Sequence, residues 1–328
     1  MWIVEMADKM RWKRTAQILV VGAVLFFLGL NIYRGWRDAS RFQWNVRPWL
    51  LVASFALALA FWFATGIGWN LLVRYLGGSL TLRKGMRVYF LSNLGWYVPG
   101  KVWYAVGRAY LARQEGASVE VISTSVVMEI VLSLTSSAWM AALALPLLFP
   151  ILGAKVLYVG IAVLILGLAA LHPALMTRTL TFVERVLPGP RRAMTPPLRY
   201  ATMLGLLVGY LFIWGFVGAA FFVLLNAVYP LPIAWLPTVA AIYAASWIAG
   251  FLTPSPSGFG VREGAMIFLL GKYLPVPAVT AAAILFRLWL VLAEVLWAAV
   301  AIRRNSGELG GTRGNLVMSG AKDQEKMD

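Results

Sequence analysis

Glu129 is a carboxylate near the middle of a long apolar stretch, residues 118–148. Three serines share its helical face at i−4, i+4 and i+7: Ser125, Ser133 and Ser136. An ionisable group inside hydrocarbon is costly unless it is paired or hydrated, and it commonly marks a transport pathway. We therefore expect Glu129 to line a polar cavity. The alternative is a structural hydrogen bond between helices, with the serines as small packing residues.

Arg287 is a second charge within an apolar stretch, residues 276–302, and Glu294 follows it two turns later on the same face. Arginine stays protonated, so it needs a carboxylate, a phosphate or water at that depth. A pair with Glu129 would be structural, whereas a lipid phosphate held bidentately would be functional. Both remain open, because the two partners can alternate in a transport cycle.

Two further apolar stretches are broken by Pro and Gly, at residues 93–101 and 252–263, and each break is followed by charge. Backbone N–H groups at a helix start bind anions, and an adjacent Lys or Arg strengthens such a site. Arg108 and Arg262 are expected to act there. The alternative for Lys101 and Arg113 is that they only extend to the membrane interface, and this is what we expect of Arg113. The substrate-binding candidates are Pro99, Gly100, Lys101, Arg108, Glu129, Gly258, Arg262, Glu263 and Arg287.

The elements that must position these residues are membrane helices. The chain is 61% hydrophobic and 13% charged, far more apolar than a soluble domain. Runs of about 20 apolar residues, each long enough to cross a bilayer, recur along it. The sequence therefore predicts an all-α polytopic membrane protein. Six full spans are expected at 16–33, 48–72, 118–148, 154–172, 200–227 and 276–302.

The segments on either side of each break are too short to be full spans. Residues 88–98 and 101–113 flank the first break, and 239–252 and 261–273 flank the second. At 1.5 Å per residue each piece is roughly 16–21 Å long, against about 30 Å of hydrocarbon. Two re-entrant hairpins account for these lengths. Paired broken segments in the two halves of a membrane protein are the strongest sequence indication of a transport site.

The net charge of +16 comes mainly from loops between apolar stretches, which indicates orientation rather than nucleic-acid binding. Placing both termini in the cytoplasm puts most loop Lys and Arg on the inner side. The first hairpin then enters from the cytoplasmic side and the second from the opposite side, as in an inverted-topology repeat. Gly100 and Glu129 are 29 residues apart, as are Gly258 and Arg287, which supports the repeat as a hypothesis.

The chain is expected to be one transmembrane domain, residues 1–302, followed by a polar, disordered cytoplasmic tail, 303–328. It has no cysteine and a single histidine, His172, so Cys-based chemistry is excluded and one ligand does not make a metal site. No nucleophile–base set or phosphate-binding loop is present. We therefore expect neither an enzyme nor a cofactor.

The two breaks also carry a family resemblance. The first, from Ser92 to Lys101, is followed by Gly107, Arg108, Gly116 and Glu129, and the second runs from Pro256 to Glu263. Together they resemble the lysylphosphatidylglycerol synthase transmembrane-region family over residues 15–302. That family includes the membrane half of the multiple peptide resistance factor, which flips aminoacylated phosphatidylglycerol.

The resemblance implies that 99–108 and 256–263 line a lipid site, with Glu129 and Arg287 nearby. Without the aminoacyl-transfer domain, synthesis of the lipid is not expected. The leading hypothesis is a flippase for a polar, phosphate-bearing, aminoacylated or glycosylated lipid headgroup in a prokaryotic cytoplasmic membrane. One alternative is a non-transporting partner of a lipid-modifying or glycosyl-transfer enzyme, docked through residues 173–199. The other is a small-solute or ion transporter.

Overall fold

The structure, a computed structural model, describes residues 46–97, 102–148, 153–186, 198–253 and 255–324, with side chains described as far as Ile302. This part of the chain is helical, and no strand occurs within it. The predicted span at 16–33 lies outside the described residues. The longer helices are α2 (Pro48–Tyr75), α5 (Val119–Ala142), α7 (Lys155–Leu171), α9 (Tyr200–Val228), α10 (Leu236–Leu252) and α12 (Val276–Gln324).

Five apolar helices in the described ranges are long enough to cross a membrane: Pro48–Tyr75, Val119–Ala142, Tyr200–Val228, Ile233–Leu252 and Val276–Ile302. Four of them correspond to predicted spans, so the prediction of an all-α polytopic membrane fold is confirmed. The helix in the predicted span 118–148 is shorter than expected. α5 ends at Ala142, and a separate one-turn helix, α6 (Leu145–Leu148), follows it. α12 continues as helix beyond residue 302, and the predicted division into a domain and a tail stays a prediction.

The predicted span 154–172 is part of a bent pair. α7 has 17 residues and meets α8 (Pro173–Val186) at an angle of 68°. His172, which precedes a proline, is in an extended conformation with ψ of 133°. Proline disfavours helical backbone in the residue before it and is itself well tolerated at the first helical position. The bend therefore follows from the His172–Pro173 sequence.

The first arm of the second predicted hairpin is longer than expected. The predicted arm begins at residue 239, but the helix starts at Leu236, after a 3-10 turn at η3 (Ile233–Trp235). Pro237 lies in the first turn of α10, where its missing N–H costs no hydrogen bond. Residues 233–252 make 20 helical residues, about 30 Å, which is long enough to span.

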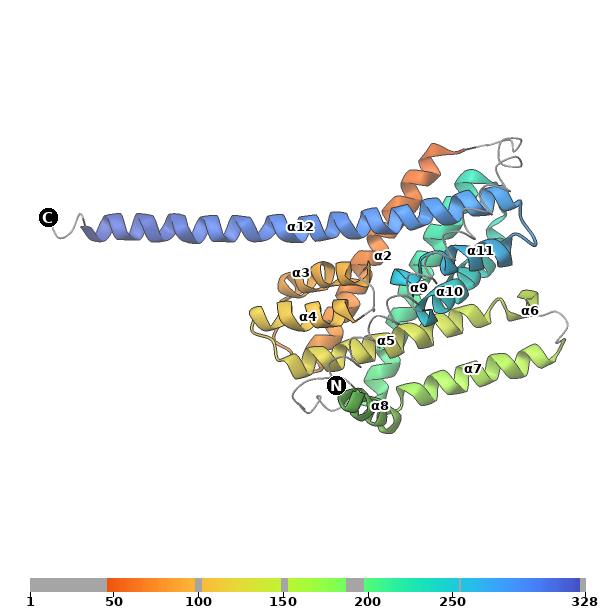
Figure 1. Cartoon of the computed structure of the whole chain (residues 1–328), viewed down its shortest axis with the longest axis horizontal. Coiled ribbons are helices and arrows are strands. Elements are labelled where there is room, and N and C mark those ends of the chain that lie inside the picture. Colours follow the sequence, from red (N-terminus) through yellow and green to blue (C-terminus); the bar gives the residue numbers. More distant parts are fainter. Residues whose placement is uncertain (1–45, 98–101, 149–152, 187–197, 254, 325–328) are drawn as a thin grey trace, which may run out of the picture.

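Two hairpins approach each other from opposite ends of the helix bundle (Figure 1). The first consists of α3 (Leu82–Asn93), the 3-10 turn η1 (Leu94–Tyr97) and α4 (Trp103–Gln114). The second consists of α10, the 3-10 turn η4 (Pro256–Gly258) and α11 (Val261–Leu270). The two turns, η1 and η4, contact each other inside the bundle, and we call them the first and second tips. Opposed hairpins agree with the predicted directions, and an internal repeat stays a prediction.

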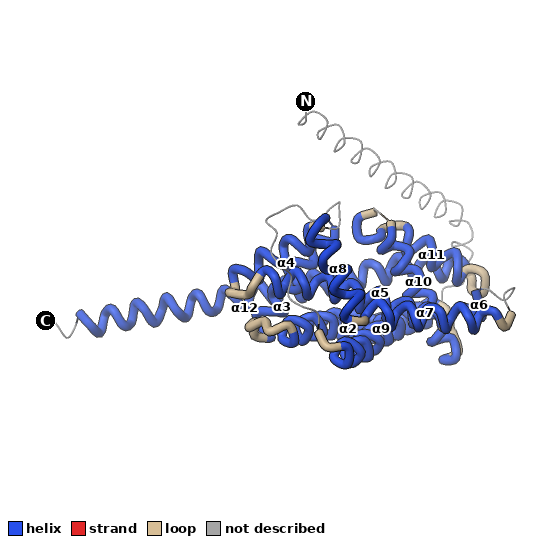
Figure 2. Tube along the Cα trace, turned by 90° about the horizontal axis from the view of Figure 1, so that it is seen from below, coloured by secondary structure: helices blue, strands red, loops and turns tan. Residues whose placement is uncertain are grey.

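The remaining helices form the frame around the tips. α2 and α9 pack closely, and the Ser54 hydroxyl on α2 donates to the Ala220 carbonyl on α9 at 2.8 Å. α9 also approaches α10 closely at Gly218, where a Cβ would lie 2.4 Å from that of Ala240. Small residues allow this backbone approach, which is typical of membrane helices. Figure 2 shows α2 and α9 lying next to each other on one side of the bundle.

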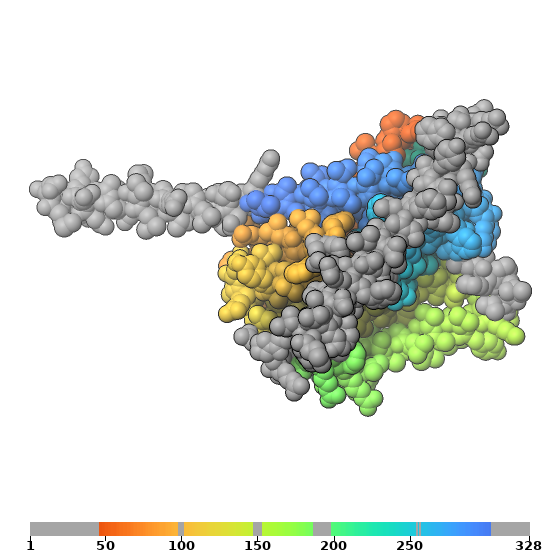
Figure 3. Space-filling model, in the orientation of Figure 1, coloured from red at the N-terminus to blue at the C-terminus, as the bar shows by residue number. Residues whose placement is uncertain are grey.

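The outer surface of the bundle is apolar. Val52, Tyr158 and Phe212 are each at least 70% exposed, as are other large side chains around the helices. Figure 3 shows α12 lying along α3 at the surface of the bundle. Exposed apolar area on this scale does not suit water, and with five spanning helices it identifies an integral membrane protein.

The two ends of the bundle differ in charge. The end where α2 stops and α3 begins, here the basic end, carries Arg74, Arg83, Lys84, Arg113 and Arg199. The opposite end carries Arg47, Lys155 and Lys272 among the described residues. The asymmetry within the described residues has the same sense as the loop charges in the sequence.

Candidate functional site

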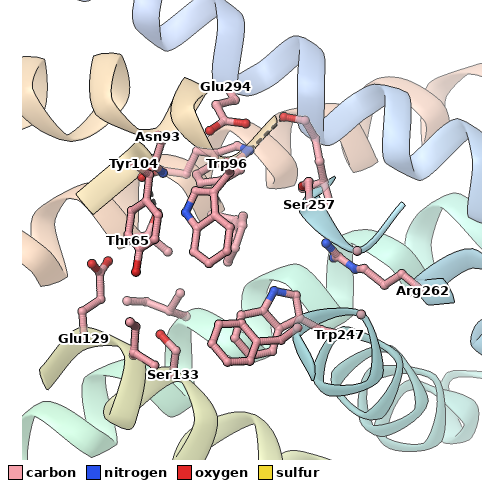
Figure 4. Close-up of a pocket in the computed structure, with 18 of the residues that line it drawn as sticks. Thr65, Asn93, Trp96, Tyr104, Glu129, Ser133, Trp247, Ser257, Arg262 and Glu294 are labelled. Atoms are coloured by element: carbon pink, nitrogen blue, oxygen red, sulfur yellow. Dashed lines mark hydrogen bonds between the residues drawn. The ribbon is translucent and has the colours of Figure 1, made fainter. Parts of the chain in front are cut away.

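A cavity of about 160 Å³ lies where the two tips meet. Its walls come from both hairpins and from α2, α5, α9 and α12. Figure 4 shows Glu129 and Ser133 on α5, with Trp247 and Arg262 on the second hairpin. The volume exceeds the space of a single water several-fold. A mostly apolar cavity with a few charged side chains on its wall is the arrangement expected of a binding site.

Arg108, on α4 of the first hairpin, is 1% exposed and is held by three polar groups. Its guanidinium forms an ion pair with Glu129 of α5. It also donates from Nη2 to Asn93 Oδ1 at 2.6 Å and from Nε to Ser92 Oγ at 3.2 Å. We call these four residues the Arg108 cluster. The cluster ties α3, α4 and α5 together, and it fixes the first hairpin on the frame.

Aromatic rings enclose the same guanidinium. Its carbon lies 4.5 Å from the ring centroid of Tyr89, 4.9 Å from that of Trp69 and 5.5 Å from that of Tyr104. A cation over aromatic faces is stabilised by the ring quadrupoles, more strongly where water is excluded. Trp69 in turn donates to the Ser125 hydroxyl at 3.0 Å. Ser125, predicted on the face of Glu129, therefore orients this aromatic shell.

Glu129 fits both interpretations of the sequence, a cavity-lining residue and a structural contact between helices. It lines the cavity, and it also makes the structural ion pair with Arg108. The alternative that paired Arg287 with Glu129 is wrong, because each has a different partner. Spacing along one chain does not show which of two buried acids lies nearer to a given arginine.

Arg262, on α11 at the second tip, is 9% exposed and lines the cavity. It donates to the hydroxyl of Tyr243, and the ring of the same residue lies 4.9 Å from its guanidinium carbon. None of the carboxylates in the described parts of the chain forms an ion pair with it. Arg262 is therefore a buried cation on the cavity wall whose charge no carboxylate there directly balances.

Arg287, on α12, joins the second tip from the other side. Its Nη2 donates to the Ser257 carbonyl at 3.0 Å, and its Nε lies 3.8 Å from Glu263 Oε1. The other oxygen of Glu263 accepts the Gly260 N–H at 2.7 Å, which caps the start of α11. Glu263 lies outside the cavity lining, and its contacts show a helix-capping role that supports Arg287.

The second tip requires glycine at its closest point. Gly258 has a φ of 69°, and a Cβ there would lie 2.9 Å from the Gly250 Cα on α10. Neighbouring Ser257 also has positive φ, 51°. Gly258 lines the cavity, and the close approach of the two hairpin arms explains why glycine is needed there.

Glu294, on α12, was not among the predicted site residues although it lines the cavity. It is 1% exposed, and its Oε2 accepts the Tyr97 hydroxyl of the first tip at 2.6 Å. Its Oε1 is buried without a hydrogen-bond partner. The signal was available, since Glu294 is an acid inside an apolar stretch, as Glu129 is.

Aromatic side chains also join the two tips. The Trp96 ring of the first tip stacks on the Tyr104 ring, with their centroids 4.2 Å apart. The centroid of the Phe251 ring, on α10, lies 6.1 Å from that of Trp96. Phe251 stacks in turn on Trp247 at 5.3 Å. Which rings meet along this side of the cavity depends on which turn each tip brings there, and spacing along the chain does not show it. The three remaining candidates, Pro99, Gly100 and Lys101, lie outside the described residues, and their role stays a prediction.

Comparison with known proteins bears on this site. A search of curated proteins finds no match to the chain. The family described as the lysylphosphatidylglycerol synthase TM region matches residues 15–298, which include every described wall of the cavity. The chain therefore belongs to the lysylphosphatidylglycerol synthase TM-region family, as its two broken segments indicated.

Proposed function

We propose that this protein is a lipid flippase whose cavity holds a polar, phosphate-bearing headgroup while the lipid tails stay in the bilayer. The observation that carries the proposal is the convergence of Arg262 and Arg287 on one cavity between two opposed hairpin tips. Membership of a family named for a lipid synthase membrane region supports lipid as the substrate class.

The charges on the cavity wall favour an anionic headgroup. Arg262 forms no ion pair with a carboxylate among the described residues, and Glu263 stands 3.8 Å from Arg287, beyond hydrogen-bond length. A guanidinium presents a planar set of donors that fits two oxygens of one phosphate. Arg108 is already bonded on three sides, so we assign it to holding the hairpin.

The opposed hairpins supply a route for the headgroup. Each tip lies inside the bundle and each hairpin reaches back to a different end. Withdrawing one tip opens the cavity to one end and leaves the other closed, which is the geometry of alternating access. We further propose that the molecule lies in a cytoplasmic membrane with its basic end toward the cytoplasm, following the positive-inside rule.

The test is transport in vesicles of phosphatidylcholine and phosphatidylglycerol that carry the purified protein and a fluorescent phosphatidylglycerol. Headgroups moved between leaflets change their accessibility to a membrane-impermeant quencher. Arg262→Ala and Arg287→Ala should each reduce the rate by about 10- to 100-fold, since a hydrogen bond to a charged group contributes roughly 1.5–3 kcal/mol. Arg113→Ala, an exposed arginine on α4, is the matched control and should transport normally.

Normal transport by folded Arg262→Ala and Arg287→Ala would contradict the headgroup site. The small size of the cavity also suits a free anion, so the small-solute alternative is tested in parallel by uptake of inorganic phosphate. Uptake of phosphate with no movement of any anionic, aminoacylated or glycosylated lipid would favour that alternative. Absence of both activities would favour a docking partner for a lipid-modifying enzyme.

A further inference from the structure

One helix, α12, holds both hairpin tips. At Glu294 it accepts a hydrogen bond from Tyr97 of the first tip. Seven residues earlier, at Arg287, it donates to the Ser257 carbonyl of the second tip. Seven residues are about two helical turns, so both contacts lie on one face of α12. A change at either contact acts directly on one tip and leaves the other attached.

The contact at Glu294 is incompletely satisfied. Glu129 has Arg108 as its ion partner, and Glu263 has both Arg287 and the Gly260 N–H. Glu294 has the Tyr97 hydroxyl on one oxygen, while the other oxygen is buried without a hydrogen bond. An ionised carboxylate buried in this way carries a large desolvation cost, and binding one proton removes its charge.

We propose that Glu294 is the proton-binding site of this transporter and that its protonation releases the first tip from α12. This inference rests on the proposed function, because it names the ion that would drive transport. The step is a simple proton uptake, in which the Glu294 carboxylate becomes a carboxylic acid and Tyr97 keeps its own proton. The O–H···O⁻ bond from Tyr97 then becomes a bond between neutral groups, roughly half as strong.

The groups around Glu294 fit a proton better than a metal cation. Among the described residues, the charged and titratable groups that face this stretch of α12 are Tyr97 on η1, Tyr243 on α10, Arg287 on α12 itself, and Arg262 and Glu263 on α11. Three packed helices contribute aromatic side chains beside α12: Trp62 on α2, Phe90 on α3 and Phe221 on α9. Arg287 already has Glu263 as its ion partner, and the two arginines nearby disfavour a metal cation at Glu294, whereas buried acids in membrane helices serve as proton relays.

The first experiment measures proton binding without transport. Infrared difference spectra of the purified protein in phospholipid nanodiscs are recorded during a pH titration, and the carbonyl band of a protonated acid is followed. Wild type and Glu120→Gln, a matched change on α5 outside the cavity lining, should both show this band. Glu294→Gln should lose it. Tyr97→Phe, which keeps the acid but removes its donor, should shift the midpoint to higher pH.

An unchanged band in Glu294→Gln, together with an unshifted midpoint in Tyr97→Phe, would overturn the assignment. So would displacement of the bound proton by sodium at fixed pH, because the site would then bind a metal cation. If Glu294→Gln does not fold, the Tyr97→Phe midpoint decides the question alone.

The second experiment tests coupling in the phosphatidylcholine and phosphatidylglycerol vesicles described above. An imposed pH gradient should accelerate headgroup movement by wild type and by Glu120→Gln, and Glu294→Gln should lose this dependence. A wild type that transports lipid equally with and without the gradient would overturn the coupling. If the infrared carbonyl band of Glu294 titrates but the protein moves no lipid, the proton-binding site is supported and the proposed flippase function is contradicted.

Discussion

At the scale of single residues, the buried charges of this protein are organised as separate pairs. Arg108 and Glu129 form one pair between the first hairpin and α5, and Arg287 and Glu263 form another between α12 and α11. Each charge alone in the apolar interior would be strongly unfavourable, so partners and hydrogen bonds decide whether it is tolerated. Arg262 has no carboxylate partner among the described residues, and one oxygen of Glu294 has no hydrogen bond. We have assigned Arg262, together with Arg287, to the headgroup and Glu294 to a proton.

The Arg108–Glu129 pair can be tested through stability. Glu129→Gln leaves a buried guanidinium without its carboxylate and should destabilise the protein by about 3–5 kcal/mol. Thermal unfolding in detergent measures this loss as a lower midpoint. The double variant Arg108→Met with Glu129→Gln should recover part of the stability, because it removes both charges.

Glu120→Gln serves as the matched control on the same helix and should unfold close to wild type. Strictly additive losses in the double variant would mean that the two residues do not act as a pair. In that case the ion pair would not be what fixes the first hairpin to α5.

At the scale of elements, the hairpins depend on backbone approach as much as on charge. The first tip folds back so tightly that a Cβ on Gly95 would lie 2.6 Å from the backbone nitrogen of Tyr104. The backbone of α4 cannot yield as the end of a flexible side chain can. Pro and Gly predict the break at this position from the sequence, but they do not show this contact with α4.

We therefore expect Gly95→Ala to loosen the first hairpin. The substitution should lower the unfolding midpoint, by an amount typical of overpacking, about 1–3 kcal/mol. Gly107→Ala on α4 is the matched control, since a Cβ there meets Ser92 only at 3.9 Å, an ordinary contact. Equal stability of the two variants would show that the tip is less tightly packed than the structure indicates.

At the scale of the whole molecule, the opposed hairpins define two ends that must face opposite sides of a membrane. The basic end includes Arg113, and the other end includes Lys155; both residues are exposed. The excess of Lys and Arg predicts that the basic end stays in the cytoplasm.

Because the chain contains no cysteine, single-cysteine variants report this orientation directly. In intact cells an impermeant thiol reagent should label Lys155→Cys and leave Arg113→Cys unlabelled until the membrane is opened. The reverse pattern would invert the proposed orientation. Labelling of both variants in intact cells would instead contradict the placement of the two residues at opposite ends.

The sequence by itself determined the membrane class, four of the described spans and the two breaks, because each depends on local composition and on length compared with the bilayer. It also identified Arg108, Glu129, Arg262 and Arg287 as charges that needed an explanation. α10 begins at Leu236, three residues before the predicted start, with Pro237 in its first helical turn. Element boundaries depend on such capping detail, which apolar content does not show.

Only the tertiary structure decided which buried charges are paired and which face the cavity. Arg108 and Glu129 are 21 residues apart and Tyr97 and Glu294 are 197 apart, so no helical periodicity connects them. Pairing is set by which turn of each helix lies opposite which tip, and that depends on packing across the bundle. The sequence therefore shows where the charges lie along the chain. The fold decides which of them hold the hairpins in place and which face the proposed ligand.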